Sequence, residues 1–126
     1  MQTIILDANA ILRHILNDIV EQANEVEDIL RNHRVLVLPE VIAEVIYVLA
    51  KYYNLPKDVS THSLLEFLDD ANYSLGIINN ALVTFNNNNL DFVDCLLYEY
   101  SKLPGYKILT FDKDLLRLIN KDTGEV

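Results

Sequence analysis

Short apolar runs alternate along the chain with longer segments in which apolar residues recur every three or four positions. Runs such as "TIIL" and "VLVL" are typical of buried strands, whereas the longer spacing is typical of helices that bury one face. This alternation predicts an α/β fold with a mostly parallel central sheet. We expect strands at residues 2–6, 35–38 and 106–110, and a weaker one at 73–77.

Helical spacing fills the segments between these strands. The first turn of a helix leaves its N–H groups unpaired, so Pro39 and Pro56 are suited to open two of the helices. Four asparagines at 86–89 predict a loop, because their side chains bond to nearby backbone. We expect helices at 9–16, 19–32, 39–53, 56–70, up to about 85, 91–102 and 112–120.

Composition narrows the class of protein. With 126 residues, 51% of them hydrophobic, the chain suffices for one domain, which we expect to span residues 1–126. Its single cysteine, Cys95, excludes an internal disulfide and a cysteine-rich zinc site, and its apolar neighbours suggest a buried thiol. No apolar run approaches the roughly 20 residues of a membrane span, and no signal peptide is recognisable. We therefore expect a cytoplasmic protein that does not enter the membrane.

Four acidic residues stand where four separate segments would each deliver one carboxylate. Asp7 follows the first predicted strand and Asp112 the last, at the carboxyl ends where open α/β sheets carry their functional crevice. Glu44 and Asp94 lie on predicted helices, at the border of the apolar face. Converging carboxylates repel one another unless a cation lies between them, and oxygen ligands favour Mg²⁺ or Mn²⁺ over zinc. The pattern predicts a metal-dependent hydrolytic site.

Three further polar residues are candidates for a supporting role. Asn9 and Thr110 each stand two residues from an acid at a predicted strand end, where they can orient its carboxylate. Asp91 precedes Asp94 by three residues and shares its helix face. Asp91 is either a helix cap or an outer-sphere acid.

Each acid also has an interpretation that involves no ion. Asp7, Asp91 and Asp112 all precede predicted helices and can cap them, and Asp94 would favour the helix dipole from the first turn. Glu44 is harder to explain in this way, because an unpaired carboxylate at a core boundary costs free energy. The joint arrangement is more specific than any of its members.

The ordered motifs carry a family resemblance. "ILDANAIL", "LPEVIAEVIYVL", "DFVDCLLYEY" and "ILTFDKDLLRL", spread over about residues 3–120, resemble the successive motifs of PIN-domain proteins. The similarity is greatest to the ribonuclease toxins of VapBC-type toxin–antitoxin pairs. It implies a three-layer α/β/α sandwich that cuts RNA with Mg²⁺ or Mn²⁺, commonly as a homodimer blocked by an antitoxin protein. Carried over by position, it implies a metal cluster of Asp7, Glu44, Asp94 and Asp112, supported by Asn9 and Thr110.

The expected chemistry is hydrolysis of an RNA phosphodiester bond by a metal-activated water. Four carboxylates carry enough charge for two ions, which in such sites stand about 3.5–4 Å apart. No histidine is needed for this reaction, and we assign no role to His14, His33 or His62.

The net charge of −9 argues against general affinity for nucleic acids, although the four acids account for −4 of it and leave −5. Basic residues near the expected crevice are few: Arg13, Lys113 and Arg117. An acidic surface also suits a basic protein partner.

Three other classes compete with the nuclease. A phosphoacceptor receiver domain requires paired acids on the first strand, and "TIILDAN" lacks them. A haloacid-dehalogenase-type phosphatase requires a second aspartate where Asn9 stands. A non-catalytic acidic α/β protein-interaction module fits the caps equally well, but it predicts no gain in stability when metal ions are added.

Overall fold

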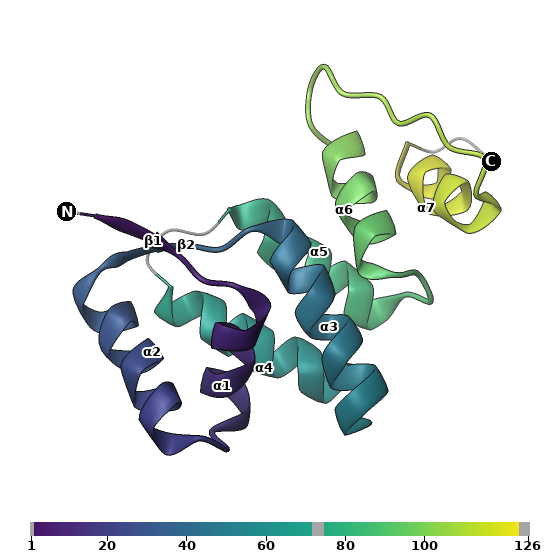
Figure 1. Cartoon of the computed structure of the whole chain (residues 1–126). Coiled ribbons are helices and arrows are strands. Elements are labelled where there is room, and N and C mark those ends of the chain that lie inside the picture. The colour runs from purple at the N-terminus through teal and green to yellow at the C-terminus, as the bar shows by residue number, and fades with distance from the viewer. Residues whose placement is uncertain (1, 72–74, 124–126) are drawn as a thin grey trace. The chain divides into compact units, whose positions relative to one another are not determined.

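Two short strands pair in parallel in the first part of the chain (Figure 1). β1 (Thr3–Ile5) lies beside β2 (Arg34–Leu36), with Ile4 opposite Val35. This computed structural model describes residues 2–71 and 75–123 and contains two compact units, Met1–Leu75 and Gly76–Val126. The crossover between β1 and β2 is helical, as a parallel pair requires.

In the first unit four helices pack against one another, and the second of them also contacts β2. Their apolar stripes meet in a core that includes Ile11, Val26, Ile42, Leu49 and Phe67. Asn17 and Asn54 end two of the helices with φ of 52°, the left-handed conformation that commonly terminates a helix. The helices are α1 (Ala8–Leu16), α2 (Val20–Asn32), α3 (Pro39–Tyr53) and α4 (Lys57–Asp70), and they confirm the four predicted for this part of the chain.

The second unit is a packing of three helices, α5 (Gly76–Asn87), α6 (Phe92–Ser101) and α7 (Lys113–Thr123). α6 contacts both of the others. Phe85 of α5 and Phe92 of α6 meet edge to face with ring centroids 6.4 Å apart. Cys95 of α6 is fully buried, which confirms its thiol as part of the core. None of the helices that the structure describes is long and apolar enough to cross a membrane.

Two predicted strands are wrong. Residues 106–110 form no strand in the described second unit, and there Leu109 and Phe111 are 87% and 89% exposed. A strand needs a hydrogen-bonded neighbour, and an apolar run alone does not supply one. Of the predicted strand at 73–77, residues 73 and 74 lie outside the described part, while Gly76 and Ile77 belong to α5. α5 also continues to Asn87, two residues into the predicted asparagine loop.

The described part of the chain is therefore mostly helical, with a small two-stranded parallel sheet. This agrees with the α/β class but shows less sheet than the sequence pattern predicts. The prediction of one domain over residues 1–126 stays a prediction.

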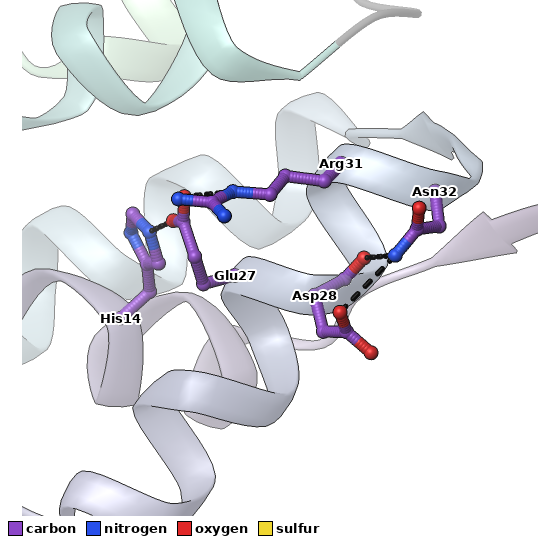
Figure 2. Close-up of polar contacts among 5 residues, drawn as sticks. All are labelled: His14, Glu27, Asp28, Arg31 and Asn32. Atoms are coloured by element: carbon purple, nitrogen blue, oxygen red, sulfur yellow. Dashed lines mark hydrogen bonds and ion pairs between the residues drawn. The ribbon is translucent and has the colours of Figure 1, made fainter.

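A histidine joins the first two helices (Figure 2). His14 Nε2 of α1 lies 2.8 Å from Glu27 Oε2 of α2, and Arg31 Nε donates to the other oxygen of the same carboxylate at 3.1 Å. The His14 ring also meets Phe67 of α4 edge to face, with centroids 5.4 Å apart. The hydrogen bond with His14 is the main cause that lowers the pKa of Glu27. Through its contacts with Glu27 and Phe67, His14 connects three helices of the first unit, α1, α2 and α4.

We expect Glu27→Gln to lower the free energy of unfolding by about 0.5–1 kcal/mol near neutral pH, the scale of a partly exposed ion pair. The folded-state pKa of Glu27 is lowered from its ordinary value of 4.5. Its contribution is therefore complete above that value and is lost as the pH falls through the lowered pKa. Urea unfolding from neutral to acidic pH should show the difference between wild type and variant closing on the acid side.

A neighbouring acid on the same helix provides the control. Asp28 accepts a hydrogen bond from the side chain of Asn32 at 3.1 Å, and asparagine at position 28 can still accept it. Asp28→Asn should leave the pH dependence of unfolding as in the wild type. A Glu27→Gln curve parallel to that of the wild type at every pH would contradict the ion-pair account.

Candidate functional site

Asp7 stands between β1 and α1, where an extended backbone turns into a helix. Its Oδ1 accepts a hydrogen bond from Ala10 N at 2.8 Å and so caps α1. The structural interpretation of Asp7 as a cap is therefore correct. The cap uses one carboxylate oxygen, and the second can still serve an ion, since a carboxylate offers several lone pairs.

A pocket of about 230 Å³ opens beside Asp7 within the first unit. Asn9 and Arg13 of α1 line it together with Gln22 and Glu25 of α2. Arg13 pairs with Asp18 at 3.2 Å and its side chain is only 14% exposed. Its buried Nε has no hydrogen-bond partner among the described residues. The pocket thus combines two acids, Asp7 and Glu25, with a guanidinium that has one donor without a hydrogen-bond partner among the described residues.

Gln22 and Glu25 were not among the residues singled out from the sequence. Both are exposed polar residues of the amphipathic helix α2. The sequence pattern contains no signal that separates them from other solvated side chains of that helix. Only the packing of α2 beside α1 brings them to Asp7.

Glu44 is exposed near the middle of α3. The sequence pattern places it at the border of the apolar face, where an unpaired carboxylate would be costly. In the first unit water solvates it, so burial does not require it to have a partner. A functional role for Glu44 therefore depends on a ligand that its carboxylate binds, and its burial gives no argument for one.

Three acids gather in the second unit at the starts of two helices. Asp91 Oδ1 accepts from Asp94 N at 2.8 Å and caps α6. Asp112 Oδ1 accepts from Leu115 N at 2.9 Å, and Asp112 N donates to Thr110 Oγ1 at 3.0 Å. Thr110 therefore holds the backbone of Asp112 in place. The cap interpretation of Asp91 and Asp112 is correct, as is the placement of Asp94 in the first turn of α6.

The electrostatics of Asp94 show that these carboxylates lie in one another's field. Partial burial raises its pKa first, and the charges of Asp91 and Asp112 raise it further. A cation placed among them would reverse this effect, because it favours the ionised form.

The four predicted ligands are divided between the units. Asp7 and Glu44 belong to the first and Asp94 and Asp112 to the second. Among residues 2–71 and 75–123, no group of three or more histidine, cysteine or acidic side chains is arranged to hold a metal ion. The donor chemistry still suits a hard divalent cation, because every candidate ligand is a carboxylate. The four-acid cluster stays a prediction.

Comparison with known proteins identifies the family. The PIN domain family model matches residues 4–121, which include all seven candidate site residues. No curated protein and no solved structure matches the chain. PIN domains are α/β proteins, typically nucleases, and they generally depend on a divalent metal ion.

Proposed function

The chain belongs to the PIN-domain family, and on this premise we propose that it is a metal-dependent endoribonuclease, the toxin of a toxin–antitoxin pair acting in the cytoplasm. The observation that carries the proposal is the extent of the family match. It runs from residue 4 to residue 121 and so contains Asp7, Glu44, Asp94 and Asp112 in their expected order. The raised pKa of Asp94 supports a cation near the last two.

The complete domain is a three-layer α/β/α sandwich in this proposal, as the family resemblance implies. Exposed apolar side chains support it. Leu109 and Phe111 in the second unit and Ile5 on β1 in the first are all more than half exposed. Layers on both faces of a parallel sheet would bury such side chains.

The four acids would hold Mg²⁺ or Mn²⁺, which when bound activates water and neutralises charge during phosphodiester hydrolysis. The caps at Asp7 and Asp112 fix two of these carboxylates to helix ends, and Thr110 holds the backbone of Asp112. Fixed ligands lose little entropy when they bind. Asn9 lies in the Asp7 pocket with Arg13, whose guanidinium suits a phosphate oxygen.

Cleavage of a structured RNA by the purified protein tests the proposal. We expect cutting with Mg²⁺ or Mn²⁺ and none with EDTA. Mn²⁺ should also raise the melting temperature, since an ion at about 100 times its dissociation constant stabilises the folded state by about 2.7 kcal/mol. If the protein neither cuts RNA nor shows a rise in melting temperature with Mn²⁺, the nuclease proposal is rejected and the acidic protein-interaction module is favoured.

A homodimer and an antitoxin partner complete the proposal. Tyr47, Tyr52 and Tyr53 on α3 are 53%, 65% and 42% exposed, and tyrosine is enriched at protein interfaces. Lys51 Nζ lies 5.2 Å from the ring centre of Tyr47 and 5.6 Å from that of Tyr52, which orders the patch. Sedimentation velocity of the wild type and of Tyr52→Ala tests the proposed dimer. A wild-type protein that sediments as a monomer would exclude it.

A further inference from the structure

A second pocket lies within the second unit, and its lining includes none of the proposed metal ligands. It has a volume of about 350 Å³, within the roughly 300–1,000 Å³ of small-ligand sites. One wall is the loop after α5 and the other is α7. Leu90 in the first wall directly precedes Asp91, and Asp114 in the second follows Asp112 by two residues. Both walls of the pocket are therefore within two residues, along the chain, of the acids Asp91 and Asp112 at the helix starts.

Two basic side chains line this pocket. Arg117 and Lys121 stand one turn apart on α7 and so share a face of the helix. Arg117 Nη1 lies 3.1 Å from Asp114 Oδ1, in a pair that is 77% and 64% exposed. Such an exposed pair is weak and can exchange for another anion. With one acid against two bases, the charged lining has a surplus of positive charge.

The distribution of charge over the chain makes this pocket unusual. Residues 1–75 contain twelve acidic and five basic residues, a net charge of −7, whereas residues 76–126 contain seven acidic and five basic residues, a net charge of −2. Two of those last five bases line the pocket. By net charge, the second unit repels an anionic strand less than the first does.

The remaining lining suits a nucleotide more than a simple anion. Asn88 and Asn89 contribute side-chain amides, and the Asn88 amide is positioned by donating to Thr84 O at 2.9 Å. Amides of this kind bond to base edges and to ribose hydroxyls. Leu90 and Leu118 offer apolar contact to a base. The lining thus matches phosphate, sugar and base together.

We propose that this pocket binds the RNA strand next to the cleaved bond, with Arg117 and Lys121 on neighbouring phosphates and the two asparagines on a nucleoside. Along the axis of α7, Arg117 and Lys121 stand about 7 Å and about 13 Å beyond Asp112, at 1.5 Å per residue. A strand whose reacting phosphate lies at the acids would place its next phosphates beside these two bases. The inference rests on the proposed nuclease function and names how that site holds its substrate.

Salt dependence of binding provides the test. A fluorescein-labelled single-stranded RNA of mixed sequence is titrated with the full-length protein in EDTA, by fluorescence anisotropy, over a range of NaCl concentrations. Each phosphate contact on a single strand contributes about −0.7 to the slope of log K against log salt. We expect Arg117→Gln and Lys121→Gln each to reduce that slope by about 0.7 and the double variant by about 1.4. The affinity of these variants for the RNA at low salt should also be lower than that of the wild type.

Matched variants separate this contact from a general loss of charge. Lys107→Gln removes the same charge from an exposed position in the second unit outside the pocket and should retain the wild-type slope. Arg117→Lys keeps the positive charge and should also show the wild-type slope. Equal slopes for all variants, or no binding by the wild type, overturn the inference. Because EDTA prevents cleavage, this result is independent of the ion-dependent cutting that tests the nuclease.

Discussion

Asp7→Asn is expected to reduce ion-dependent RNA cleavage at least about 100-fold while the protein stays folded. Removing a residue that only supports a metal ligand already lowers metal affinity or activity by about 10- to 100-fold. Removing a ligand itself should lower activity further. The fold should survive because Asp7 caps α1 through Oδ1, and asparagine caps a helix about as well as aspartate. The substitution therefore removes the charge and keeps the hydrogen bond. Cleavage rates and melting curves of the two proteins check both halves of the expectation.

Two further variants separate the cap from the ion site. Asp7→Ala removes both, and we expect it to lose activity and also about 1 kcal/mol of stability. Asp69→Asn changes an exposed acid on α4 and should leave cleavage intact. Full activity in Asp7→Asn would eliminate the four-acid mechanism, whatever Asp7→Ala does.

Glu99→Ala is expected to have the largest effect on stability, a loss of about 2–3 kcal/mol. Glu99 of α6 is 5% exposed. Thr84 Oγ1 of α5 donates to its Oε2 at 2.9 Å, and Lys102 Nζ lies 3.0 Å from Oε1. Alanine would leave the threonine hydroxyl without this acceptor and create a cavity between two helices. The cost stays below that of stranding a buried charge, because the Lys102 side chain is 43% exposed and water can solvate it.

An exposed ion pair supplies the comparison. Glu66 pairs with His62 on α4 at 3.0 Å, and the Glu66 side chain is 71% exposed. Glu66→Ala should change the free energy of unfolding by less than about 0.5 kcal/mol. Urea denaturation of both variants beside the wild type measures the difference. If the two substitutions cost the same small amount, the carboxylate of Glu99 is not buried between α5 and α6 in solution.

Features that depend on near neighbours in the chain are predictable from the sequence. α3 was predicted from residue 39 to residue 53 and occupies Pro39–Tyr53, because its apolar stripe and opening proline lie within one segment. A helix satisfies its own backbone hydrogen bonds, so local pattern suffices. The capping roles of Asp7, Asp91 and Asp112 were predictable for the same reason, since a cap bonds to an N–H three residues ahead. The ordered motifs also identified the PIN family.

Features that depend on partners far apart in the chain become visible in the folded protein. Residues 106–110 have a strand-like sequence but form no strand in the second unit, because a strand must borrow its hydrogen bonds from a neighbour. The pocket beside Asp7 and the pocket lined by Arg117 and Lys121 exist because separate segments pack together. The exposure of Glu44 and the raised pKa of Asp94 likewise follow from what surrounds each carboxylate in space. The chemistry at these sites depends on the distances between segments, and the spacing of residues along the sequence does not give those distances.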